Sequence, residues 1–147
     1  MAIRFNEKEF VVQFNLDYCL KRYSEIKTAE SALLSNKIKV RELAKVYTED
    51  AVLVWIESWI ANLAAFKDIS IEESQVKKTA MFILEEVYML NLAELTLLFK
   101  RIMKGSIFYN KFDGTTIIHA ARDYRQERGR ILSKMSTEQY KELFEKR

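Results

Sequence analysis

The sequence predicts an all-α fold, a compact multi-helix bundle of about seven to eight helices in a single domain spanning residues 1–147. The first indication is that the 147 residues include no proline and only three glycines. Proline breaks helix interiors, and strand proteins usually need both residues in their turns. The second is a set of candidate capping boxes, in which an N-cap side chain and a Glu or Gln three residues later close a helix start. These pairs are Asn6/Glu9, Ser70/Glu73, Asn91/Glu94 and Ser136/Gln139.

Apolar periodicity and capping signals together place the helices along the chain. Thr28, Thr48 and Asp113 are further N-cap candidates, and Gly105 suits the left-handed residue that often follows a helix. The predicted helices span residues 7–24, 29–36, 38–47, 49–67, 71–89, 92–104, 114–134 and 137–146.

The first predicted helix, 7–24, carries two apolar faces. We expect either packing between two neighbours within one monomer or a homodimer interface, since large exposed apolar patches usually mark interfaces. One face holds Phe10, Val11, Phe14 and Tyr18, and the other holds Val12, Leu16, Cys19 and Tyr23.

Two middle helices differ in pattern. Helix 49–67 is apolar almost all round, which predicts a buried, central element. Helix 71–89 has an ordinary apolar stripe, and Met81, Phe82 and Tyr88 fall outside it.

Positive charge concentrates in residues 100–134. That stretch holds nine Lys or Arg against three Asp or Glu, a net +6, whereas the whole chain carries +3. On helix 92–104 the apolar face leaves Lys100, Arg101 and Lys104 together on the opposite side. Cations are also common at helix ends for electrostatic reasons, so two interpretations stand: ordinary helix chemistry or phosphate contact.

The segment that follows interleaves aromatic rings with cations. Phe108, Tyr109 and Lys111 lie in a loop, and Arg122 and Arg125 lie on the next helix. Bases stack on rings while Lys and Arg follow phosphates, so this arrangement suits DNA or RNA, particularly single strands. The alternative is that the rings close the core between two helices.

Arg128 falls near the centre of the apolar face of helix 114–134. A charged head there must pair or extend to solvent, because an isolated buried charge is very costly. We expect a structural ion pair, with Asp113 and Glu86 as candidate partners; a ligand-facing arginine is the alternative.

No catalytic, metal or cofactor site is predicted. The chain has one His and one Cys, in different predicted helices, and no glycine-rich phosphate loop. No apolar run is long enough to span a membrane, and no signal peptide is recognisable. With one cysteine excluding an internal disulfide, we expect a cytoplasmic protein.

Residues 55–128 resemble a group of small uncharacterised helical proteins from mobile elements and prophages of gut Bacteroidetes. The shared pattern is an aromatic-basic helix, a glycine, a Tyr-containing loop, Asp-Gly, and a helix ending in Tyr and Glu-Arg. Here the pattern reads Phe99-Lys100-Arg101, Gly105, Tyr109, Asp113-Gly114, and Tyr124 with Glu127-Arg128. The loop lacks the second glycine that the group often has. The resemblance implies a neighbour of replication or transfer functions and carries no known activity.

These patterns predict a non-enzymatic accessory protein of a mobile element that binds nucleic acid through a basic surface. The alternative is a helical adaptor that binds another protein, with the first helix and Phe82 as its contact surfaces.

Overall fold

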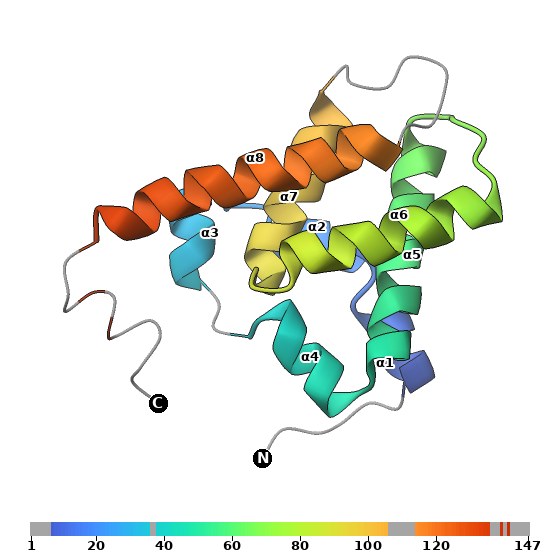
Figure 1. Cartoon of the computed structure of the whole chain (residues 1–147), viewed down its shortest axis with the longest axis horizontal. Helices are drawn as coiled ribbons and strands as arrows, with labels where there is room; N and C mark the ends of the chain where they lie inside the picture. The colour runs from blue at the N-terminus through green and yellow to red at the C-terminus, as the bar shows by residue number, and fades with distance from the viewer. Residues whose placement is uncertain (1–6, 36–37, 106–113, 136–138, 140, 142–147) are drawn as a thin grey trace.

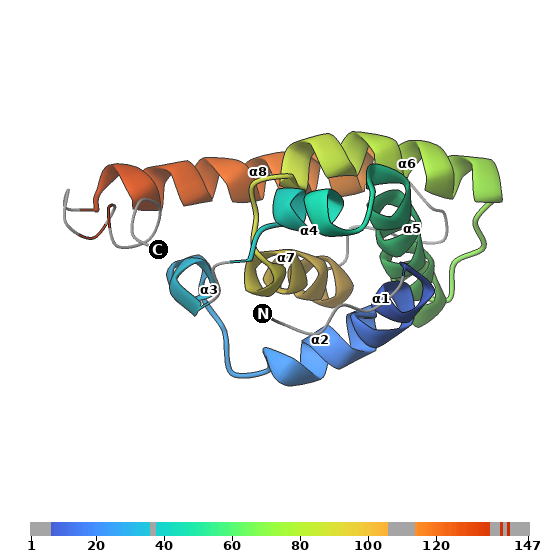
Figure 2. The same ribbon diagram turned by 90° about the horizontal axis from the view of Figure 1, so that it is seen from below.

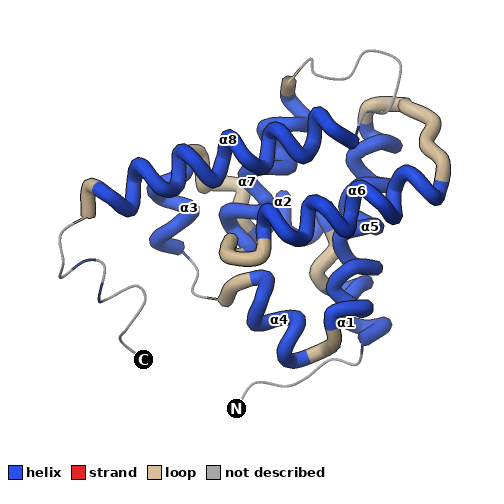
Figure 3. The backbone as a smooth tube through the Cα atoms, viewed as in Figure 1, coloured by secondary structure: helices blue, strands red, loops and turns tan. Residues whose placement is uncertain are grey.

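The chain folds as an all-α domain around one shared core, so the predicted fold class is confirmed. The computed structural model describes residues 7–35, 38–105 and 114–135, together with residues 139 and 141. Within these residues no strand forms, and Lys39 and Asn91 make an isolated antiparallel bridge (Figure 3). The helices are α1 (Glu7–Gln13), α2 (Leu16–Arg22), α3 (Ala29–Ser35), α4 (Val40–Val46), α5 (Glu49–Phe66), α6 (Glu73–Val87), α7 (Leu92–Lys104) and α8 (Gly114–Ser133) (Figure 1).

The helices are arranged around α7. In Figure 2, α6 and α8 lie on one side of α7, and α1 and α2 lie on the other. Every residue from Asn91 to Phe99 is buried, so neighbours enclose α7 on all sides except at its C-terminal end. None of the described helices is both long and apolar enough to cross a membrane.

The prediction that helix 49–67 would be a buried, central element holds in part: α5 packs against α1, α2, α4, α6 and α7, but one side of it is exposed. In α5, Val54 is 50% exposed and Phe66 is 62% exposed, although Trp55 and Trp59 are fully buried. The enclosed helix is α7, which is less uniformly apolar because Glu94 and Thr96 are buried with it. Apolar content therefore did not identify the most enclosed helix, because Glu94 and Thr96 of α7 form hydrogen bonds inside the core.

The predicted single helix 7–24 is two helices that meet at Asn15. The backbone of Asn15 is extended, and its side chain accepts a hydrogen bond from the Tyr18 amide at 2.7 Å. The Phe14 carbonyl accepts from the indole Nε1 of Trp55 at 2.7 Å and of Trp59 at 3.1 Å. The break therefore ties the N-terminal segment to α5 through the Phe14 carbonyl.

Both apolar faces of the N-terminal segment contribute to the monomer core. Phe10, Leu16 and Cys19 are essentially inaccessible, whereas Val12 remains 65% exposed. The change of direction at Asn15 lets α1 contact α5 while α2 contacts α7. Packing within one monomer therefore accounts for most of this apolar surface, and self-association stays a prediction.

The capping predictions had mixed outcomes. Thr28 and Thr48 accept from the amides of Ser31 and Ala51, and Asn91 with Glu94 forms the expected capping box. The box predicted at Ser70 was wrong, because α6 begins two residues later than expected and its box consists of Glu72 and Gln75. The capping predictions at Asn6, Asp113 and Ser136 and the predicted helix 137–146 involve positions outside the described residues.

Gly105 ends α7 without the left-handed conformation that was predicted for it. Its φ and ψ are −80° and 164°, which is extended backbone. The Lys67 ammonium, just beyond α5, donates to the Gly105 carbonyl at 2.7 Å. The positive charge of Lys67 thus meets the negative C-terminal end of the α7 dipole.

Helices α6 and α8 lie side by side and run in the same direction (Figures 1 and 2). They approach closely where α8 begins, because a Cβ added to Gly114 would overlap Thr79 Oγ1 on α6. Further along the pair, Glu86 on α6 contacts Arg122 and Arg125 on α8. Two of the predicted nucleic-acid-binding residues, Arg122 and Arg125, are therefore paired with a carboxylate of α6.

Candidate nucleic-acid interface

The C-terminal end of α7 presents its cations as the sequence pattern predicts. Phe99 and Ile102 are buried, whereas Arg101 and Lys104 are exposed and Lys100 is half-buried. The three cations do not share one environment, however, because α7 emerges between α8 on one side and the segment after α2 on the other.

Arg101 faces α8 and is paired. Its guanidinium donates to both carboxylate oxygens of Glu127, at 2.7 and 3.4 Å. It also lies over the ring of Tyr124, 5.4 Å from the ring centre. Two-point pairing and ring contact hold this arginine in place, and the pair carries no net charge.

Arg122 and Arg125 share one carboxylate on α6. Arg122 Nε lies 3.2 Å and Arg125 Nη1 lies 2.7 Å from the oxygens of Glu86. Burial by itself would raise the pKa of Glu86, but hydrogen bonds and charge from Arg125 and Arg122 outweigh burial and lower it. Both arginines remain more than half exposed, so the group of three keeps a net charge of +1 at the surface.

Lys100 faces away from α8, toward the turn after α2. There it lies near Lys27, a residue that the sequence analysis did not identify. The Lys100 ammonium lies 3.5 Å from the Ser24 carbonyl, at the turn after α2. Desolvation lowers the pKa of Lys100, and the positive charges of Lys27 and Lys104 lower it further. These three residues, Lys27, Lys100 and Lys104, are called the lysine cluster below. None of them forms an ion pair within the part of the chain that the structure describes.

Lys27 could not be found from local sequence. It lies in the connection between α2 and α3, 73 positions before Lys100, outside the basic stretch that drew attention. The packing of α2 against α7 brings the two together. The predicted residues Phe108, Tyr109 and Lys111 lie outside the described residues.

Arg128 forms the expected internal ion pair, but with a different carboxylate. Its Nε donates to Glu94 Oε2 at 2.7 Å, and its second terminal nitrogen donates to the Met89 carbonyl at 3.3 Å. The expected partner Glu86 is taken by two other arginines, and Asp113 lies outside the described residues. Sequence reasoning had assigned Glu94 only to a helix cap.

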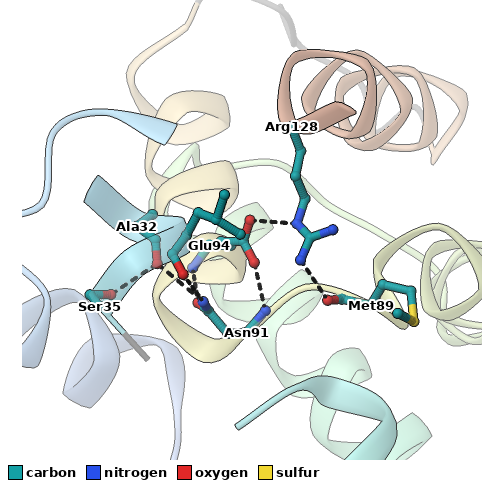
Figure 4. A network of polar contacts seen from close by, with 7 residues as sticks. Ala32, Ser35, Met89, Asn91, Glu94 and Arg128 are labelled. Atoms are coloured by element: carbon teal, nitrogen blue, oxygen red, sulfur yellow. Dashed lines mark hydrogen bonds and ion pairs between the residues drawn. The ribbon is translucent and has the colours of Figure 1, made fainter. Parts of the chain in front are cut away.

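Glu94 is the centre of a buried polar network (Figure 4). Its other oxygen accepts from the Asn91 amide at 2.9 Å, and the Asn91 side chain donates to the Ala32 carbonyl at 3.1 Å. Burial raises the pKa of Glu94, against the opposing charge of Arg128. The network joins the last turn of α3, the start of α7 and the C-terminal half of α8. Arg128 therefore faces the interior of the fold and not a ligand.

The remaining chemical features are possible metal ligands and the cysteine thiol. No group of three or more His, Cys, Asp or Glu among them could hold a metal ion. Cys19 is fully buried, and burial raises the pKa of its thiol to about 11. A thiol with that pKa is protonated near neutral pH, and the thiolate is the nucleophilic form.

Comparison of the chain with protein-family models, with curated proteins and with solved structures finds no match.

Proposed function

We propose that this protein is a non-enzymatic accessory factor of a mobile element that binds nucleic acid through the lysine cluster. The supporting observation is that Lys27, Lys100 and Lys104 lie close together with no carboxylate partner in the described part of the chain. Elsewhere on the same surface Glu127 pairs with Arg101, and Glu86 pairs with both Arg122 and Arg125.

The contrast between the two halves of the basic surface supports this proposal. Grouped ammonium ions repel one another, and the lowered pKa of Lys100 reflects part of that repulsion. A phosphate chain relieves the repulsion and releases counterions when it binds. Arg101, Arg122 and Arg125 serve mainly to hold α8 on α7 and α6, with Arg122 and Arg125 adding a secondary positive charge.

The mobile-element origin rests on the resemblance of residues 55–128. A cytoplasmic location fits both this role and a single, buried cysteine.

Titration of labelled single- and double-stranded oligonucleotides at several salt concentrations tests the proposal. With three lysine–phosphate contacts, the slope of log K against log salt should be about −2 on single strands, from roughly −0.7 per contact. The variant Lys27→Ala/Lys100→Ala/Lys104→Ala should remove about 2 units of slope and most of the low-salt affinity.

The matched control is Lys45→Ala/Lys77→Ala/Lys78→Ala, which removes the same charge from three exposed lysines outside the cluster. The control should keep the wild-type salt slope. Absence of binding at low salt, or an equal loss in both triple variants, would reject the lysine cluster as the binding site.

A further inference from the structure

A groove between α5 and α6 is lined mainly by apolar side chains. It has a volume of about 420 Å³. Leu84 forms part of its buried surface, while Leu53 and Tyr88 are half-buried and Met81 is 56% exposed. The remaining lining residues are Glu49 and Glu85. The groove thus combines apolar walls with negative charge, and its described lining includes no lysine or arginine.

The acidic charge of this groove is not neutralised by the described part of the chain. Glu86 is occupied by two arginines, but neither Glu85 nor Glu49 forms an ion pair there. Glu85 also lies in the last turn of α6, which has no basic residue. The negative end of the helix dipole adds to its charge, so this end of the groove favours a cation.

We propose that the groove binds an amphipathic helix of a partner protein whose apolar face is flanked by Lys or Arg. Apolar residues on such a helix recur at intervals of three or four and would contact Leu53, Met81 and Tyr88, while its cations would meet Glu49 and Glu85. Methionine suits such a surface, since its flexible thioether adapts to the shape of the partner.

This site goes beyond nucleic-acid binding and shares no residue with the lysine cluster. Helix α6 and helix α2, which precedes Lys27, lie on opposite sides of α7 (Figure 2). Both sites are therefore open at once, and the chain joins a basic protein helix to a nucleic acid.

A model peptide provides the direct test. The probe is a labelled peptide of about 21 residues that repeats Leu-Lys-Lys-Leu-Leu-Lys-Leu, long enough to be helical when bound. Its partner probe carries Glu in place of every Lys. Fluorescence anisotropy should show the Leu/Lys peptide binding the wild-type chain at least about tenfold more tightly than the Leu/Glu peptide.

Two variants locate the binding to the groove. Met81→Lys should weaken binding of the Leu/Lys peptide by about tenfold or more, as expected for a central apolar contact. Glu49→Lys/Glu85→Lys should reverse the preference between the two peptides. The matched control is Phe66→Lys, which changes an exposed apolar residue of α5 outside the groove and should leave binding within about twofold.

Several results would overturn the proposal: no binding to the wild type, equal binding of the two peptides, or an equal effect of Phe66→Lys and Met81→Lys. If Met81→Lys lowers the melting temperature sharply, the double charge reversal at two exposed glutamates decides the question. A wild-type dimer in sedimentation velocity that Met81→Lys abolishes would show that a second copy of the chain occupies the groove. The lysine-cluster variant should bind the Leu/Lys peptide normally, so failure of one site is distinguishable from failure of the other.

Discussion

The Nε atom of Arg128 lies 2.7 Å from Oε2 of Glu94, which joins α8 to the buried start of α7. The Glu94 side chain is fully inaccessible, and that of Arg128 is 11% exposed. The fold tolerates two buried charges here because they pair with each other and each also forms a hydrogen bond with the backbone. Glu94 accepts from the Asn91 amide, and Arg128 donates to the Met89 carbonyl.

Loss of Arg128 should destabilise the fold strongly. Arg128→Ala leaves the buried carboxylate of Glu94 unpaired, and we expect it to lower the free energy of unfolding by about 3–5 kcal/mol. Adding Glu94→Gln should recover part of that loss, since the neutral amide can still accept from Asn91. Urea denaturation measures both variants.

The comparison is Arg130→Ala, at an exposed site on the same helix, which should change stability by less than about 0.5 kcal/mol. A similarly small effect of Arg128→Ala would contradict a structural role for the pair.

The two glycines of α8 should respond oppositely to alanine. Gly114→Ala places a methyl group against the buried Thr79, and we expect a loss of about 1–3 kcal/mol in the free energy of unfolding. Gly129 has open space around its Cα, so Gly129→Ala should stabilise the helix by about 0.5–1 kcal/mol. Thermal and urea unfolding of the two variants side by side checks this. Equal effects would mean that α6 and α8 do not approach closely at Gly114.

The helix break at Asn15 depends on its side chain. Asn15→Ala removes the acceptor for the Tyr18 amide and should cost about 1 kcal/mol, the usual value for an N-cap. Asn15→Asp keeps an acceptor oxygen and should be nearly neutral. Equilibrium unfolding distinguishes the two. If Asn15→Ala were as stable as the wild type, the break would depend on the indole bonds to Phe14 and not on the cap.

Protonation of Glu86 should weaken the contact between α6 and α8. Its pKa is lowered in the folded state, so its stabilising effect is complete above the ordinary carboxyl pKa and is lost as pH falls through the lowered value. We therefore expect Glu86→Gln to be less stable than the wild type at pH 7, with the difference shrinking below about pH 4.5. Urea unfolding across this range measures the difference.

Glu85→Gln is the control, because it removes a neighbouring charge but no arginine contact. A difference between Glu86→Gln and wild type that does not change with pH would rule out the proposed linkage.

Local patterns in the sequence determined the fold class and most helix positions. Caps at Thr28, Thr48 and Asn91 act over three residues and need no other part of the chain, so they are readable in isolation. The outward direction of the cations on α7 follows from helical periodicity alone. The same reasoning placed Arg128 on an apolar face and required a partner for it.

Tertiary structure decided which residues are partners and which helix is enclosed on all sides. The helix break at Asn15 combines a local cap with indole donors from α5, 40 or more positions away. The identity of the Arg128 partner depends on how α8 packs on α7. The packing of α2, α6 and α8 also gives Arg101, Arg122 and Arg125 carboxylate partners, and it brings Lys27 near Lys100 and Lys104, which form no ion pair among the described residues. Periodicity in the sequence indicates which face of a helix is buried. It does not indicate which charges meet, because an ion pair requires two side chains within a few ångströms that can be distant in sequence. The direction in which two helices cross determines those contacts.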